Sequence, residues 1–89
     1  MTGERAAATP VSAGIVGAGS IGIAFAVVFA RAGWRVKLYD PDSQRRELAP
    51  GEIRARLDDL SAYDLLSESS QSVADRIHVV ASIKEAATG

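Results

Sequence analysis

The hydrophobic pattern of the first half of the chain predicts a strand, a helix and a second strand in succession. A short run rich in β-branched residues, at Ser12 to Val16, is typical of a strand. Apolar residues then recur at helical spacing from Ile21 to Ala32, and Gly33 suits the end of that helix. Trp34 to Tyr39 alternates between apolar and polar side chains, which predicts the second strand. One face of the predicted helix carries large apolar residues, namely Ile21, Phe25, Val28 and Phe29, together with Ala32. A neighbouring stripe carries the small residues Gly22 and Ala26, where the helix can lie close to the first strand.

Two further helices are predicted after the second strand. Asp40 followed by Pro41 suits a helix start, with the acid at the N-cap and the helix continuing over Asp42 to Leu48. Pro50-Gly51 is expected to break or kink this helix. A second amphipathic helix then spans about Glu52 to Leu65, with Ile53, Leu57 and Leu60 on one face.

The last third of the chain predicts one more strand between two short helices. The serine-rich segment Ser67 to Ser72 is a turn that leads into a short helix before Arg76. Ile77 to Ala81 reads as a third strand, and Ser82 with Glu85 has the spacing of a capping box that opens a final helix.

This order of elements, β-α-β-α-α-β-α, indicates an α/β fold: the N-terminal portion of a Rossmann-type doubly wound parallel sheet, apparently truncated. A complete sheet of this type usually needs more than 89 residues. We expect residues 1–10 to be a flexible leader and residues 11–89 to be a partial Rossmann domain.

Composition narrows the possible functions. The chain is 47% hydrophobic and 24% charged, with a net charge of −1 and no cysteine, so a nucleic-acid partner, disulfides and thiolate metal sites are not expected. Val11 to Ala30 contains no charge and has the length of a membrane span. Its four glycines, two serines and internal change from strand to helix period argue against that alternative. We expect a cytoplasmic protein without a membrane partner.

Three glycines between the first strand and the helix form the spacing G-x-G-x-x-G, typical of a dinucleotide-binding turn. In such a turn Gly17 permits the sharp bend, Gly19 lets the backbone approach a pyrophosphate, and Gly22 allows the helix to pack closely on the sheet. Backbone amides at the start of the helix then face the phosphates. The alternative is a glycine-rich turn that binds nothing.

Asp40 lies 18 residues after Gly22, near the offset expected of the acid that binds the adenosine ribose. A carboxylate there repels a 2′-phosphate, which favours NAD over NADP. Asp40 can also serve only as a helix cap. The predicted cofactor-binding residues are Gly17, Ala18, Gly19, Ser20, Ile21, Gly22 and Asp40.

No catalytic residue and no metal ligand is predicted within these 89 residues. His78, the one histidine, is expected to be a partly buried strand residue. Arg45 and Arg46 belong to a solvated helical face and are minor candidates for contact with an anionic substrate. Trp34 and Tyr39 are expected to pack or to cover the adenine pocket.

From GAGSIGIAFAVVFARAGWRVKLYD at Gly17 to Asp40, the sequence resembles the N-terminal NAD-binding domain of the 3-hydroxyacyl-CoA dehydrogenase family. The 36 residues between Asp40 and Ile77 match the helical excursion of that family, and VVASIKEAATG fits its continuation. The likeness covers about residues 11–89. It is greatest to the branch of L-gulonate 3-dehydrogenase and lambda-crystallin, followed by the 3-hydroxybutyryl-CoA enzymes.

The resemblance implies NAD-dependent oxidation of the 3-hydroxy group of a hydroxyacyl-CoA or hydroxy acid, in a full-length protein that forms a homodimer. The family's catalytic histidine and its glutamate partner follow later strands, so the 89 residues alone are expected to bind NAD weakly and to catalyse nothing. CoA-dependent members use a serine and a lysine on the excursion, and no lysine occurs here between Lys37 and Lys84. The alternatives are a non-catalytic NAD-sensing regulatory domain and another NAD-dependent dehydrogenase, of the sugar-nucleotide or 6-phosphogluconate type.

Overall fold

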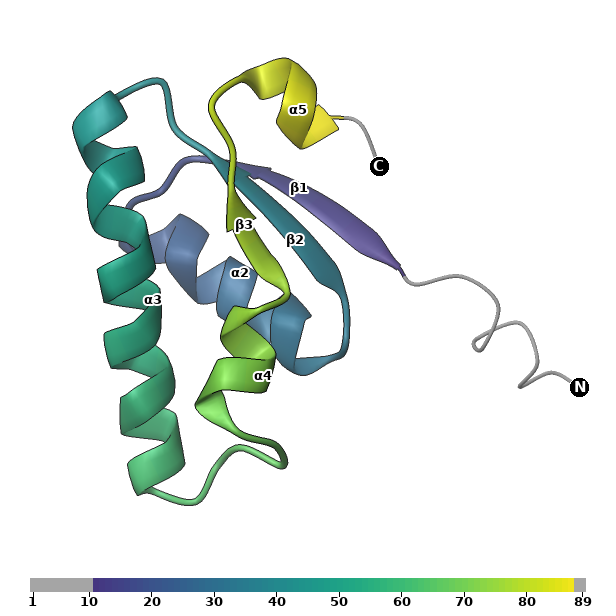
Figure 1. The fold of residues 1–89 in the computed structure, drawn as a ribbon, viewed down its shortest axis with the longest axis vertical. Coiled ribbons are helices and arrows are strands. Elements are labelled where there is room, and N and C mark those ends of the chain that lie inside the picture. Colours follow the sequence, from purple (N-terminus) through teal and green to yellow (C-terminus); the bar gives the residue numbers. More distant parts are fainter. Residues whose placement is uncertain (1–10, 88–89) are drawn as a thin grey trace, which may run out of the picture.

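A computed structural model of the chain describes residues 11–87 and shows the predicted alternation of strands and helices (Figure 1). The predicted leader, residues 1–10, lies outside the described residues. The elements are β1 (Ser12–Val16), α2 (Ser20–Arg31), β2 (Arg35–Tyr39), α3 (Ser43–Ala62), α4 (Ser70–Ala74), β3 (Ile77–Val79) and α5 (Ile83–Ala87).

The three strands form one parallel sheet in the order β1-β2-β3, with Ile15 beside Leu38 and Leu38 beside Val79. Helices cover both faces of β1. A Cβ atom on Gly22 of α2 would lie 3.7 Å from the Ile15 side chain, whereas one on Gly14, the neighbouring strand residue, would overlap the carbonyl oxygen of Ala86 in α5. This arrangement confirms the predicted Rossmann-type fold with its parallel sheet.

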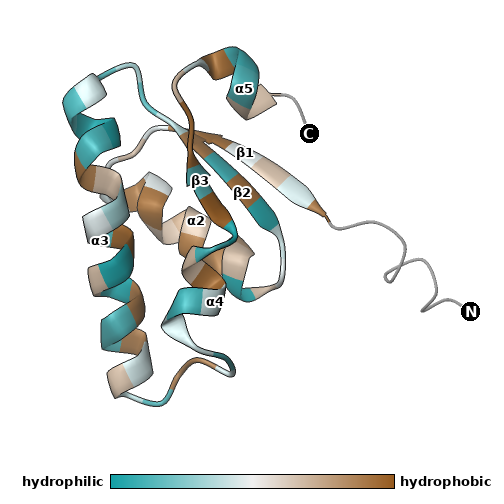
Figure 2. Ribbon diagram, in the orientation of Figure 1, coloured by the Kyte–Doolittle hydropathy of each residue, from teal (hydrophilic) through white to brown (hydrophobic). Residues whose placement is uncertain are grey.

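The core lies between the sheet and the helices α2 and α3. Val36 and Leu38 of β2 are fully buried, and they meet the small and medium-sized side chains of α2. The predicted apolar face of the second amphipathic helix is confirmed, since Ile53 and Leu57 are buried and Leu60 is partly buried. Figure 2 shows apolar residues as brown bands on the strands and at intervals along α2 and α3.

The face of α2 that carries its largest apolar side chains points away from the sheet. Ile21, Phe25 and Val28 are 74%, 53% and 56% exposed. The buried residues of α2 are instead Ile23, Ala26, Val27 and Ala30. Small residues at Gly22 and Ala26 let the helix lie close to β1, as the pattern predicted, and this close approach turns the large side chains outward.

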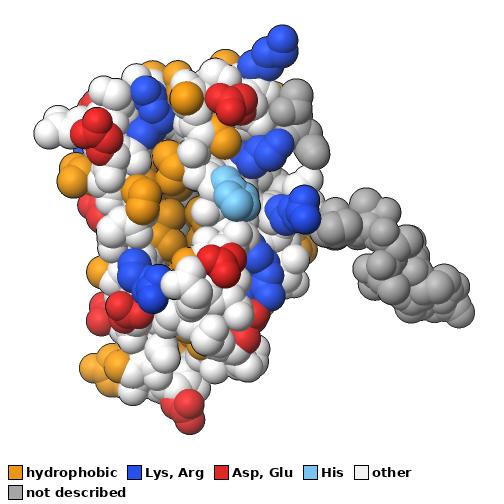
Figure 3. All heavy atoms as spheres, in the orientation of Figure 1, with side chains coloured by type: hydrophobic (Ala, Val, Ile, Leu, Met, Phe, Trp, Pro, Cys, Tyr) orange, Lys and Arg blue, Asp and Glu red, His pale blue; other side chains and the backbone are white. Residues whose placement is uncertain are grey.

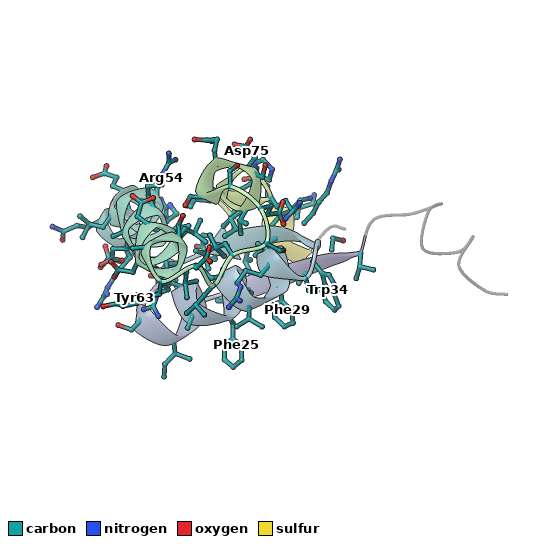
Figure 4. All side chains as sticks on the ribbon, turned by 90° about the horizontal axis from the view of Figure 1, so that it is seen from below. Phe25, Phe29, Trp34, Arg54, Tyr63 and Asp75 are labelled. Carbon is teal, nitrogen blue, oxygen red and sulfur yellow. The ribbon has the colours of Figure 1, made fainter. Side chains whose placement is uncertain are left out.

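The outward face of α2 forms an apolar surface beside β1, which is an edge strand of the sheet formed by residues 11–87. Phe29 stacks between Phe25 and Trp34, with ring centroids 6.3 Å and 4.9 Å away, and Figure 4 shows all three on the same side of the molecule. Val16, at the end of β1, is 59% exposed. Trp34 therefore packs on α2, at the opposite end of the sheet from the glycine turn.

Two predictions for the segment after β2 are wrong. A single helix, α3, runs from Ser43 to Ala62 through Pro50, so Pro50-Gly51 does not break the helix and no separate second helix begins near Glu52 (Figure 1). The N-cap is Asp42, whose Oδ1 accepts a hydrogen bond from the Gln44 amide at 2.9 Å, and not Asp40. Burial of Ala49 and Ile53 on both sides of the proline holds the helix together across it.

The remaining elements agree with the sequence patterns at their starts. The cap predicted at Ser82 is confirmed, because Ser82 Oγ accepts from the Glu85 amide at 3.1 Å. The reciprocal bond of a capping box is displaced by one residue, since the Glu85 carboxylate accepts from the Ala81 amide at 3.3 Å. β3 ends at Val79, two residues before the predicted end at Ala81. In the described part of the chain no helix is both long and apolar enough to cross a membrane.

Candidate dinucleotide site

The glycine turn joins the carboxyl end of β1 to the N-terminus of α2. Gly17 has φ = +118°, a conformation that residues with a side chain rarely adopt, and its amide donates to the Tyr39 carbonyl at 2.6 Å. Gly19 is the N-cap of α2 and provides no side-chain cap, and the helix begins at Ser20. The turn is therefore fixed to the end of β2 while the first amides of the helix remain without a capping group.

Two glycines of the turn differ in the space around them: Gly22 is closely packed and Gly19 is not. A Cβ atom on Gly22 would overlap the carbonyl oxygen of Gly17, so a residue with a side chain cannot occupy this position without moving α2. A Cβ atom on Gly19 would meet only one side-chain atom, 3.9 Å away. Gly22 thus has the predicted packing role, and the space over Gly19 is free for a ligand that approaches the backbone.

The start of α2 has the electrostatic character of an anion site. The first amides of a helix have no intrahelical acceptor, and the helix dipole places partial positive charge there. No acidic side chain lies in the first turn, and within residues 11–87 the amides of Ser20 and Ile21 have no hydrogen-bond acceptor. These donors fit the phosphates of a dinucleotide, which the sequence motif predicts at this place.

Asp40 follows β2 directly and holds the glycine turn through its carboxylate. Oδ2 accepts from the Ala18 amide and Oδ1 accepts from the Asp42 amide, each at 2.9 Å. These bonds, the Ala18 bond foremost, keep the pKa of Asp40 below its usual value, and the charges of Arg45 and Arg46 act in the same direction. Asp40 is therefore ionised at neutral pH.

The Asp40 carboxylate retains capacity for a ligand. An ionised carboxylate offers about four lone-pair positions, and two are used by the backbone amides. The remaining positions can accept from two ribose hydroxyls, as the motif predicts. Ala18, predicted to bind the cofactor, has its side chain buried and its amide engaged with Asp40, so it acts on the site by shaping the turn.

Two arginines in the first turn of α3 face this site. Arg46 donates to the Asp40 carbonyl at 2.7 Å, and its guanidinium lies 5.7 Å from the centre of the Tyr39 ring. Arg45 is the side chain nearest the space above Gly19. The sequence patterns assigned both arginines to a solvated helical face and made them minor candidates for contact with an anionic substrate, because nothing in the local pattern shows which way the first turn of α3 points.

A hollow of about 540 Å³ lies beside the glycine turn, next to the end of β1. Its wall is formed by residues of β1, the turn and α2, namely Ile15, Val16, Gly17, Gly19, Ser20, Ile21, Gly22 and Phe25. The hollow is mainly apolar at its sides and bounded by backbone amides at one end. Such a mixture suits a ligand with a polar phosphate portion and less polar ring systems.

His78 lies outside this site. It is exposed, not partly buried as predicted, because it points to the opposite side of the sheet from the core residues Leu38 and Val79 (Figure 3). Gly14 is a residue whose role the sequence did not reveal: its missing side chain lets α5 rest on β1. A strand glycine outside a turn motif carries no signal of the helix that will cover it.

Comparison with known proteins identifies a family and several solved structures that are similar to this chain. Residues 12–89 match the family model described as "3-hydroxyacyl-CoA dehydrogenase, NAD binding domain". No curated protein matches the chain significantly by sequence.

Several solved structures are similar to the chain. A 3-hydroxybutyryl-CoA dehydrogenase from Escherichia coli is 28% identical over 90% of this chain, and an (S)-3-hydroxybutyryl-CoA dehydrogenase from Ralstonia eutropha is 27% identical over 86%. Both superpose with a TM-score of 0.75. FadB2 of M. tuberculosis, 21% identical over 89% of this chain with the same TM-score, shows the likeness of fold alone. The matched region spans 17%, 28% and 27% of those three chains, respectively.

Proposed function

Because this chain belongs to the family of 3-hydroxyacyl-CoA dehydrogenase NAD-binding domains, we propose that it holds NAD between the glycine turn and Asp40. The amides of Ser20 and Ile21 bind the pyrophosphate, and Gly17, Gly19 and Gly22 let the backbone approach it. The Asp40 carboxylate accepts from the adenosine ribose. The observation that carries this proposal is the bond from the Ala18 amide to Asp40 Oδ2, which fixes the acid against the turn at 2.9 Å.

The whole protein is proposed to oxidise the 3-hydroxy group of a hydroxyacyl-CoA or hydroxy acid. Bound NAD⁺ supplies the hydride acceptor for this chemistry. The residues of this chain contribute binding and orientation: the turn fixes the pyrophosphate and Asp40 fixes the adenosine end. The proton of the substrate hydroxyl requires a base, and the family resemblance assigns that role to a histidine–glutamate pair after residue 89.

Among substrates, we propose a sugar acid or another hydroxy acid, as in the L-gulonate 3-dehydrogenase and lambda-crystallin branch. Support comes from the excursion between Lys37 and Lys84, which contains no lysine of the kind that CoA-dependent members use there. The E. coli and Ralstonia enzymes are named for 3-hydroxybutyryl-CoA, so that substrate is the direct competitor. Assays with L-gulonate and with 3-hydroxybutyryl-CoA, on a protein that includes the catalytic pair, separate the two. NADH formation only with the CoA thioester would contradict the sugar-acid proposal.

The cofactor proposal is tested by titration of the chain with NADH and NADPH. We expect NADH to bind and NADPH to bind at least about tenfold more weakly, because the Asp40 carboxylate repels the 2′-phosphate. Asp40→Asn should weaken NADH binding by about 10- to 100-fold, because hydrogen bonds to a charged acceptor are lost. It should also reduce the difference in affinity between NADH and NADPH.

Asp42→Asn is the matched control. It removes the same charge two residues away, and asparagine caps a helix as well as aspartate does. We expect its affinity for NADH to equal that of the unmodified chain. Equal losses in both variants would show that the effect is one of net charge, and an unchanged cofactor preference in Asp40→Asn would remove Asp40 from the ribose site.

A further inference from the structure

We propose that Arg45 is a phosphate ligand of the cofactor, with its guanidinium closing over the glycine turn and contacting the pyrophosphate of NAD. The inference rests on the proposed function, since it adds a side chain from α3 to a site otherwise made by β1, α2 and Asp40. No part of the glycine motif predicts a residue at this position.

The position of the guanidinium is the first reason. A Cβ atom built on Gly19 would make an ordinary van der Waals contact with Arg45 Nη1, at 3.9 Å, and would have no other heavy atom outside the turn within 4 Å. Gly19 is the glycine over which the pyrophosphate approaches the backbone in this type of turn. The Arg45 guanidinium therefore lies beside the place where the phosphates would approach the backbone of the turn.

The second reason is that the Arg45 guanidinium has no partner among the described residues. Its guanidinium is exposed and makes no hydrogen bond or ion pair with any residue between 11 and 87, although its charge reaches Asp40 and helps to lower the pKa of that carboxyl. Arg46, its neighbour, is committed to the Asp40 carbonyl and the Tyr39 ring. Arg45 thus keeps its donors for a ligand, and guanidinium groups bind phosphate oxygens in pairs.

The way the chain builds this position is the third reason. Asp40 directly follows the last residue of β2, and α3 begins at Ser43, directly after its N-cap Asp42. Arg45 consequently lies in the first turn of α3, at the same edge of the sheet as the glycine turn. The Asp42 cap and the Arg46 bond to the Asp40 carbonyl fix the first turn of α3, so the backbone of Arg45 is held near the glycine turn and its side chain can reach a ligand there.

The test compares Arg45→Gln with Arg35→Gln. Arg35 begins β2 at the opposite end of the sheet, and its exposed side chain carries the same charge. We expect Arg45→Gln to weaken NADH and NADPH equally, each by about tenfold, which is the size of one charge-assisted contact. Adenosine, which lacks the pyrophosphate, should bind the unmodified chain and Arg45→Gln alike. Arg35→Gln should bind all three ligands as the unmodified chain does.

Each other outcome contradicts a specific step. If Arg45→Gln weakened the binding of NADPH alone, Arg45 would contact the 2′-phosphate and not the pyrophosphate. If it weakened adenosine binding as much as NADH binding, the substitution would disturb the site in general. Either result overturns the inference. Unchanged NADH affinity in Arg45→Gln overturns it as well. Failure of the unmodified chain to bind NADH contradicts the proposed function itself, which distinguishes that failure from the failure of the Arg45 contact.

Discussion

Gly22 lies where α2 comes closest to the glycine turn, and its replacement by alanine tests that contact directly. The added methyl group would overlap the carbonyl oxygen of Gly17 and lie 2.8 Å from the carbonyl carbon. Both atoms belong to the backbone, so no rotamer change relieves the overlap. Relief requires either α2 to move away from β1 or the turn to change its conformation.

The expected cost follows from these contacts. Inserting a methyl group into a closely packed interior costs about 1–3 kcal/mol, and the backbone origin of the overlap places Gly22→Ala at the upper end. Alanine returns up to about 1 kcal/mol through its higher helix propensity. We therefore expect the free energy of unfolding to fall by about 2 kcal/mol, which lowers the Tm of a domain of this size by about 10 °C.

Urea denaturation followed by circular dichroism measures this loss, and Gly51→Ala is the matched control. Gly51 also lies in a helix, but a Cβ atom there would meet nothing within 4 Å, so alanine should stabilise α3 by about 0.5–1 kcal/mol. Gly22→Ala with the stability of the unmodified chain would refute the close approach of α2 to the turn. A loss of similar size in both variants would show that the effect does not depend on the contact.

Three further predictions concern the core, α3 and the acid. Leu57→Ala should lower the free energy of unfolding by about 2–5 kcal/mol, because Leu57 is fully buried. Ile21→Ala should change it by less than about 0.5 kcal/mol, because Ile21 is 74% exposed. Equal effects of the two substitutions in urea denaturation would contradict the observed orientation of α2. Pro50→Ala should raise the midpoint of urea denaturation, because it restores a hydrogen bond inside the continuous helix, and a lower midpoint would indicate that the proline ends one helix and starts another. The pKa of Asp40 is lowered in the folded chain, so its contribution to stability is complete above its unfolded value and is lost as the pH falls through the lower folded value. The stability difference between the unmodified chain and Asp40→Asn should therefore shrink as the pH falls below about 4, and a difference that grows as the pH falls would contradict this origin.

The elements that the sequence predicts well are those whose signals are local. Alternation marks β2, the β-branched run marks β1, and the Ser82–Glu85 spacing marks the start of α5. The glycine turn is equally local, because each glycine meets a requirement of the backbone at its own position. Asp40 was located by its distance from the turn along the chain.

The features that escaped prediction depend on contacts between distant segments. Almost every side of α2 is apolar, so its pattern alone does not show that Ala26 faces the sheet and Phe25 faces outward. Pro50 stays within α3 because tertiary burial of Ile53 outweighs a local preference. The direction of Arg45 depends on how α3 leaves the sheet, which no periodicity encodes.

The central claim is that the glycine turn and Asp40 together bind NAD, and amide chemical-shift mapping tests it most directly. The ¹⁵N-labelled chain is titrated with NAD, and the account predicts the largest shifts at the amides of Gly19 to Gly22 and at Asp40 and Asp42. The hollow of about 420 Å³ at the other end of α2, lined by Val28, Leu65 and Val73 among others, is the internal reference and should stay unchanged. Shifts that gather at that hollow, or that leave the glycine turn unaffected at saturating NAD, would contradict the account.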